Sequence, residues 1–91
     1  GYYRAGAFGV RIENLIVVQP APDLPNGDDR AMLEFETITF APIDLRLIEA
    51  SLLTVREKNW LNAYHQEVHA KLTQLLDATT AQWLANATAP I

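Results

Sequence analysis

Residues 7–18 decide the fold class of this chain, and their sequence is Ala7-Phe8-Gly9-Val10-Arg11-Ile12-Glu13-Asn14-Leu15-Ile16-Val17-Val18. Along the first half of this stretch, apolar side chains alternate with the charged Arg11 and Glu13, and a period of two predicts a β-strand. From Leu15 onward the residues of both faces are apolar, which is typical of a strand buried on two sides. We therefore expect one strand over residues 7–18 that lies deep inside a sheet.

A loop and a second strand follow the first. Residues 20–29 are dense in proline, glycine and acidic residues, and Asn26-Gly27 predicts a turn within them. Residues 33–40 predict a second strand, antiparallel to the first. The apolar positions of this strand change phase after Phe35, from odd to even numbers. A bulge, or a strand that leaves one sheet for another surface, explains such a shift.

The second half of the chain predicts helices. Residues 43–48 predict an irregular or single-turn connector. Thr54 and Glu57 form a capping box, and apolar residues spaced three and four apart predict a helix to about residue 76. These apolar residues are Leu61, Tyr64, Val68, Leu72 and Leu75. A second, weaker capping box over residues 79–82 predicts a short helix, so the fold class is α+β, with a small antiparallel β portion followed by C-terminal helices.

Composition excludes several classes of protein. The chain has 91 residues, a net charge of −4 and no cysteine. No apolar run reaches the roughly 18–20 residues of a membrane span, and without a Lys/Arg cluster we expect neither a nucleic-acid nor a membrane partner. The lack of cysteine excludes a disulfide scaffold and fits a reducing compartment, and we expect the cytoplasm. Because residue 1 is Gly rather than Met, we expect the interior of a longer chain.

Arg11 and Glu13 are the first candidates for a site. Residues two apart on a strand lie on the same face, about 6.5–7 Å apart at Cα. A guanidinium beside a carboxylate on a buried apolar strand is either a structural ion pair or part of a site, and the spacing alone favours the structural pair. A single Glu does not make a metal site, because hard divalent cations require several carboxylate oxygens or imidazoles.

His65 and His69 lie four residues apart on one face of the predicted helix, a spacing that suits a metal ion. Glu67 does not stand where the zinc-peptidase patterns require a glutamate, and it lies on the far side of the helix from the two histidines. We therefore interpret both histidines as surface residues that flank the apolar stripe.

The remaining features have simple interpretations. Asp28-Asp29 is assigned to turn chemistry, and Asn86-Ala87-Thr88 to a chance match with a glycosylation sequon. Trp60 and Trp83 are assigned to the core or to an interface. The sequence contains no nucleophile elbow, no Gly-rich phosphate loop and no Cys/His ligand set.

The same sequence resembles a known family. Two stretches are similar to the last active-site strand of the Xaa-Pro aminopeptidases (aminopeptidase P, in the pita-bread metallopeptidase family): Gly1-Tyr2-Tyr3 and Gly6-Ala7-Phe8-Gly9-Val10-Arg11-Ile12-Glu13-Asn14. Residues 33–44, 52–54 and 60–65 resemble the C-terminal extension of the long, three-domain members. The resemblance implies that residues 1–42 are the last strands of a pita-bread catalytic domain and that residues 43–91 are a helical extension.

That resemblance also implies a metal site. In the family, two divalent ions, usually manganese, are held by two Asp, one His and two Glu, and they activate a water that attacks the Xaa-Pro carbonyl. Glu13 matches the last of these ligands, which is expected to bridge both metals, and Arg11 matches an arginine that orients it. The structural interpretation of this pair is thereby reversed. The other four ligands correspond to positions before Gly1.

The resemblance implies that the parent chain removes the N-terminal residue from peptides with proline in second position, and that it forms a homodimer through the extension. Because four of five ligands lie outside, we expect this chain alone to hold no catalytic residue, to bind no metal pair tightly and to hydrolyse no peptide. Two alternatives remain open: a prolidase-like Xaa-Pro dipeptidase parent, and a dimerisation or structural module without catalysis. Open strand edges also predict that the chain pairs with copies of itself.

Overall fold

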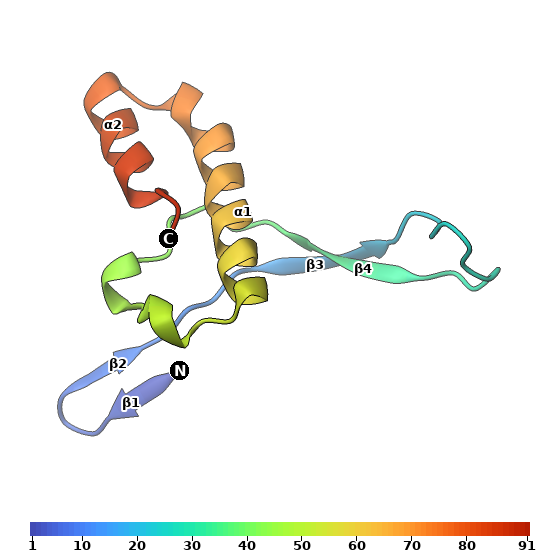
Figure 1. Ribbon diagram of the computed structural model, residues 1–91, viewed down its shortest axis with the longest axis horizontal. Coiled ribbons are helices and arrows are strands. Elements are labelled where there is room, and N and C mark those ends of the chain that lie inside the picture. The colour runs from blue at the N-terminus through green and yellow to red at the C-terminus, as the bar shows by residue number, and fades with distance from the viewer. The chain divides into compact units, whose positions relative to one another are not determined.

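The computed structural model describes all residues, Gly1–Ile91, and its chain divides into two units, Gly1–Thr39 and Phe40–Ile91. The first unit holds four strands in two hairpins, and the second holds the helices (Figure 1). The predicted α+β class is confirmed. No helix of the chain is both long enough and apolar enough to cross a membrane.

Strand β1 (Tyr2–Arg4) pairs with strand β2 (Phe8–Val10) in an antiparallel hairpin. In the turn, Ala7 donates its backbone N–H to the carbonyl oxygen of Arg4 at 3.0 Å, and Gly6 has a φ of 69°. Residues with a side chain rarely adopt this left-handed conformation, so glycine allows a short loop to close the hairpin. The register places Tyr3 directly opposite Gly9.

Strands β3 (Ile16–Pro20) and β4 (Leu33–Thr37) form the second hairpin. They are antiparallel, as predicted, and their register is continuous from Ile16 opposite Thr37 to Pro20 opposite Leu33. The turn predicted at Asn26-Gly27 is confirmed: Gly27 donates its N–H to the carbonyl of Leu24 at 2.8 Å, and Asn26 has a φ of 63°. Asparagine at the third position of a turn, after proline, suits this left-handed φ.

The single strand predicted over residues 7–18 is wrong, because residues 11–15 belong to neither ladder. The chain leaves the first hairpin after Val10 and joins the second near Leu15. There the Leu15 carbonyl accepts from the N–H of Ile38 at 2.9 Å, and the Leu15 N–H donates to Thr39 Oγ1 at 2.7 Å. Period-two alternation continues through residues 11–15, but it carries no signal for the change of pairing partner.

The two faces of the second hairpin differ. Val18 lies opposite Phe35, and the alternation of side chains puts Leu33 on the same, apolar face. On the other face, Gln19 donates from Nε2 to Glu34 Oε1 at 3.0 Å. The apolar residues of both strands are exposed, so the prediction of a strand buried on two sides is wrong for this chain. A two-stranded sheet has neither a third strand nor a second layer to cover its faces.

Helix α1 (Val55–Leu72) begins at the predicted capping box. Thr54 Oγ1 accepts from the N–H of Glu57 at 3.3 Å, and Glu57 Oε2 accepts from the N–H of Thr54 at 2.8 Å. One 3₁₀ turn, η3 (Thr73–Leu75), continues the helix. A 3₁₀ turn has three residues rather than 3.6, so the apolar stripe of the helix shifts by one residue at its C-terminal end. Leu75, predicted to face the core, is 78% exposed, and Leu76 packs against the core instead.

The core of the helical unit lies between α1 and α2 (Ala78–Ala87). Its buried members are Tyr64 and Val68 of α1 and Leu84 of α2. Partly buried side chains pack against them: Phe40, Ile43, Leu72 and Leu76. Fully burying one Val or Leu side chain stabilises a fold by roughly 1.5–3 kcal/mol, so Val68 and Leu84 hold the two helices together.

The phase change in residues 33–40 marks the place where the chain leaves the sheet. No bulge interrupts the register of β3 and β4. Ile38 still bonds to Leu15 in the first unit, whereas Phe40 packs against the core of the second. The connector predicted over residues 43–48 is confirmed: it contains the single 3₁₀ turn η1 (Leu45–Leu47). A second 3₁₀ turn, η2 (Ala50–Leu52), follows it.

The capping box predicted at residues 79–82 is wrong. Asp77 is the N-cap of α2: its Oδ1 accepts from the N–H of Thr79 at 3.0 Å and of Thr80 at 3.1 Å. Hydrogen bonds from Thr80 and Thr79 lower the pKa of Asp77. A carboxylate two residues earlier in the chain satisfies the free N–H groups at the helix start, so the helix begins there.

We expect Asp77→Ala to lower the free energy of unfolding of the chain by about 1 kcal/mol, because the N–H groups of Thr79 and Thr80 lose their acceptor. The matched variant Thr79→Ala, at the N-cap of the rejected box, is expected to stay within about 0.5 kcal/mol of the original chain. Urea denaturation followed by circular dichroism at 222 nm measures both. A larger loss in Thr79→Ala than in Asp77→Ala contradicts this assignment.

Candidate functional site

Glu13 lies in the segment between the two hairpins of the first unit, outside both strand ladders. Arg11 donates from Nη2 to Glu13 Oε1, so the predicted pairing of these two side chains is present. The side chains are 58% and 62% exposed, respectively. The pair therefore lies at the surface of this chain, and not on a buried strand as the sequence predicted.

Glu13 has the chemistry of one ligand to a divalent metal ion. A carboxylate supplies the hard oxygen atoms that such ions prefer, and the exposed side chain leaves room for other ligands. No group of three or more His, Cys, Asp or Glu side chains gathers in this chain to hold a metal. Glu13 thus fits the part of a single ligand in a larger donor set.

In the first hairpin, Gly9 of β2 lies directly opposite Tyr3 of β1. A Cβ placed on Gly9 would lie 3.0 Å from Cε1 of Tyr3 and 2.8 Å from its Cδ1, and the shorter distance is one that Cβ atoms essentially never show. The spacing of residues in the sequence does not by itself point to Tyr3. An aromatic residue that faces a glycine across a tight hairpin is the signal that identifies it, once the register is known.

His65 and His69, whose spacing would suit a metal ion, lie in different environments. His65 is fully buried, and its Nε2 accepts the backbone N–H of Ile43 at 3.0 Å. Its interpretation as a surface residue is wrong, because residues 40–43 pack over this face of the helix. His69 is half-buried. With Nε2 engaged by Ile43, His65 offers no free lone pair there for a metal.

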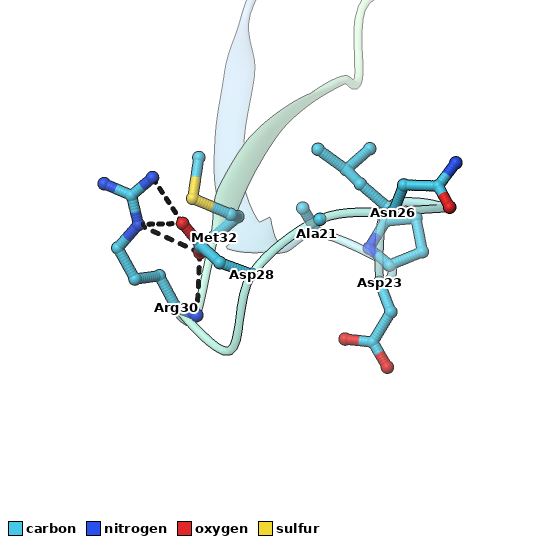
Figure 2. A pocket seen from close by; sticks show the side chains of 9 residues that line it. Ala21, Asp23, Asn26, Asp28, Arg30 and Met32 are labelled. Carbon is cyan, nitrogen blue, oxygen red and sulfur yellow. Dashed lines mark hydrogen bonds and ion pairs between the residues drawn. The ribbon is translucent and has the colours of Figure 1, made fainter.

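The acidic loop has the predicted turn chemistry (Figure 2). Asp28 Oδ1 accepts from the backbone N–H of Arg30 at 3.1 Å and from its Nε at 2.9 Å. These hydrogen bonds, with the side chain of Arg30 first, hold the pKa of Asp28 below its usual value. The loop encloses an open hollow lined by Ala21, Pro22, Asp23, Leu24, Asn26, Gly27, Asp28, Arg30 and Met32. The Asp28 carboxylate is thus occupied by its hydrogen bonds to Arg30.

The sequon residues lie at the end of α2. Thr88 is buried, and its hydroxyl donates to the carbonyl oxygen of Leu84 at 2.7 Å. The side-chain oxygen of Asn86 accepts from Gln82 at 3.4 Å. The hydroxyl that a sequon presents is therefore bonded within the helix in this fold.

Comparisons with known proteins agree with the resemblance seen in the sequence. Residues 31–91 match the family model described as the C-terminal region of peptidase_M24. The chain belongs to this family. Over 100% of its length it is 46% identical to a probable Xaa-Pro aminopeptidase P of Coprinopsis cinerea, and 45% identical to aminopeptidase P1 of Lotus japonicus.

A solved structure has the same fold. The crystal structure of an X-prolyl aminopeptidase from Caenorhabditis elegans matches 99% of this chain with a TM-score of 0.79 and 32% identity. That protein is described as a cytosolic enzyme with a di-nuclear active site. The chain spans only a small part of these proteins, 15% of the Coprinopsis cinerea protein, 14% of the Lotus japonicus protein and 15% of the Caenorhabditis elegans chain. The resemblance to aminopeptidase P and the α+β fold of its terminal part are confirmed.

We expect the pKa of His65 to lie below its usual 6.5, because burial disfavours the charged imidazole. The neutral ring stabilises the fold above pH 6.5. As the pH falls below that value, the unfolded chain takes up a proton more readily than the folded chain, and stability decreases. NMR titration of the imidazole ring measures this pKa, with urea denaturation at pH 7 and pH 5.5 as the companion measurement. A titration midpoint above 6.5 contradicts the prediction.

Proposed function

We propose that the longer protein containing this chain is a two-metal aminopeptidase that removes the N-terminal residue from peptides with proline in second position. Support comes from membership of the M24 C-terminal region family and from relatives named aminopeptidase P at 45–46% identity. The di-nuclear active site of the nematode enzyme supports two metal ions, for which we propose manganese. The description of that enzyme as cytosolic supports a cytoplasmic location.

Glu13 is proposed as the bridging metal ligand, with Arg11 as the residue that orients it. The observation that carries this assignment is the exposed Glu13 carboxylate, held by Arg11 Nη2 between two hairpins. When bound, two divalent ions supply Lewis-acid polarisation of the scissile carbonyl and a more acidic water. Arg11 keeps one carboxylate oxygen hydrogen-bonded, which limits rotation of the side chain. This chain supplies no other group to the proposed site.

The assignment of this chain to two regions of the longer protein is part of the same proposal. Residues 1–42 form the last strands of the catalytic domain, and residues 43–91 form a helical extension. The change of unit after Thr39 lies close to the proposed boundary. A prolidase-like parent differs in its substrates, because a dipeptidase cleaves Xaa-Pro alone. Rates on an Xaa-Pro dipeptide and on a longer peptide with the same first two residues distinguish these enzymes.

In the full-length protein, we expect Glu13→Gln to weaken manganese binding and to lower kcat/KM by more than about 100-fold, beyond the 10–100-fold that loss of an outer partner of a ligand costs. The amide keeps the size of the side chain but loses the charge that a bridging ligand needs. Metal content after dialysis and hydrolysis of an Xaa-Pro peptide measure the two effects.

Glu36→Gln is the matched control, an exposed carboxylate on β4 of the same unit, and it is expected to keep both properties. The 91-residue chain alone is the second comparison. It is expected to show no manganese-dependent cleavage, since it holds one proposed ligand. Unchanged metal content in Glu13→Gln, or cleavage by the chain alone, contradicts the assignment.

We also propose that the helical extension carries a homodimer contact. Trp60 of α1 and Trp83 of α2 are 56% and 58% exposed, and Trp60 stacks on Tyr64 with ring centroids 5.6 Å apart. Exposed, rigid aromatic residues are common at protein interfaces. The function of the two tryptophans in this proposal is to bury apolar surface against a second subunit.

Light scattering during size-exclusion chromatography of the full-length protein tests the dimer. We expect Trp60→Glu with Trp83→Glu to shift the mass from dimer to monomer, because two charges would be buried without partners. Gln74→Glu is the control, an exposed position in η3 that is expected to leave the mass unchanged. A monomeric parent, or a dimer that survives both tryptophan substitutions, contradicts the proposal.

A further inference from the structure

The ion pair between Arg11 and Glu13 is too exposed to fix the conformation of its two side chains by itself. Both side chains are more than half exposed, and exposed ion pairs contribute little because solvent screens them and two long side chains must be ordered. An arginine side chain has a large rotamer freedom to lose. A fixed position for the guanidinium therefore requires packing around the methylene stem of Arg11.

Tyr3 is placed to supply this packing, because it lies on the same face of the first hairpin as Arg11. In the register of β1 and β2, Tyr3 lies opposite Gly9, and alternation places Gly1 and Arg11 on that same face. A Cβ on Gly1 would lie 2.9 Å from the Tyr3 hydroxyl oxygen and 3.1 Å from Arg11 Cγ. The phenol and the stem of Arg11 thus border the same space beside Gly1.

Gly9 makes room for the Tyr3 ring. The backbone of Gly9 lies outside the left-handed region, so no conformational need explains a glycine there. Space does explain it, since a Cβ would lie 2.8 Å from Cδ1 of the Tyr3 ring. Gly6, three residues earlier, is the opposite case: its φ is 69°, and a Cβ would meet nothing within 4 Å.

We propose that Tyr3 is a positioning residue: its ring, seated on Gly9, holds the stem of Arg11 so that the guanidinium bonds and orients Glu13. The inference rests on the proposed function, in which Glu13 binds metal. Tyr3 itself touches neither metal nor substrate in this proposal. A methyl group on Gly9 displaces the ring, and Arg11 then samples other rotamers.

A double-mutant cycle in the full-length protein tests the proposal, with Mn²⁺ alone as the probe and its dissociation constant measured by titration calorimetry on metal-free protein. Gly9→Ala is expected to raise the dissociation constant by up to about 10-fold, the low end of the effect of disturbing a partner of a metal ligand, because Tyr3 acts through Arg11. Tyr3→Ala is expected to do the same. Gly9→Ala added to Tyr3→Ala is expected to change it less than about twofold further, because the ring it would displace is already gone.

Two variants separate positioning from a loss of fold. Tyr3→Phe keeps the ring and is expected to bind Mn²⁺ within about twofold of the original protein. Tyr2→Ala is the matched control: Tyr2 is as exposed as Tyr3, at 63%, but lies on the opposite face against Phe8. It is expected to leave the dissociation constant unchanged. If Tyr3→Ala does not fold, Tyr3→Leu takes its place in the cycle.

Three results would overturn the inference: normal Mn²⁺ binding in Gly9→Ala, an undiminished effect of Gly9→Ala in the Tyr3→Ala background, or equal weakening by Tyr2→Ala and Tyr3→Ala. Glu13→Gln distinguishes failure of the inference from failure of the proposed function. Loss of Mn²⁺ binding in Glu13→Gln with normal binding in Gly9→Ala rejects only the role of Tyr3. Normal binding in Glu13→Gln rejects the proposed function itself.

Discussion

Two neighbouring side chains of α1 fix the backbone that leads into the helical unit. The Tyr64 hydroxyl donates to the Ala41 carbonyl at 3.0 Å and accepts from the Ala41 N–H at 3.3 Å. His65 Nε2 accepts from the N–H of Ile43 at 3.0 Å. Because Pro42 has no N–H, every backbone donor of residues 41–43 is satisfied by the helix. Phe40 and Ile43 can therefore pack against the core without leaving polar groups unpaired.

Local signals predicted local structure well. The capping box at Thr54 and the turn at Asn26 each involve residues no more than four apart, and both are present. Predictions of burial, which depends on residues far apart in the sequence, were wrong. The burial of His65 depends on a connector more than twenty residues earlier, and the exposure of β3 depends on layers that a two-stranded sheet does not have. One local signal also failed: the box pattern indicated Thr79 as the N-cap, whereas Asp77 caps the helix by accepting from two N–H groups.

The candidate site was predictable in part. The spacing of two residues identified Arg11 and Glu13 as a pair. It could not decide whether Glu13 is part of a structural ion pair or a metal ligand, because the sequence pattern is the same in both cases. The resemblance to aminopeptidase P made that choice. Tyr3 was not predicted, because its place opposite Gly9 depends on the register between β1 and β2. A shift of that register by one residue would turn the Tyr3 ring to the opposite face of the hairpin.

Gly6 and Gly9 separate the stability of the first hairpin from the geometry of Glu13. Gly6 is needed for its left-handed φ and has open space around it, so a side chain there strains the turn and leaves the facing residues free. Gly9 has an ordinary backbone and no space, so a side chain there leaves the turn intact and moves the ring of Tyr3. The segment after Val10 lies outside both ladders. Strand hydrogen bonds therefore do not set the direction of the Glu13 carboxylate, and in the proposed arrangement the Tyr3 ring on Gly9 sets it through Arg11.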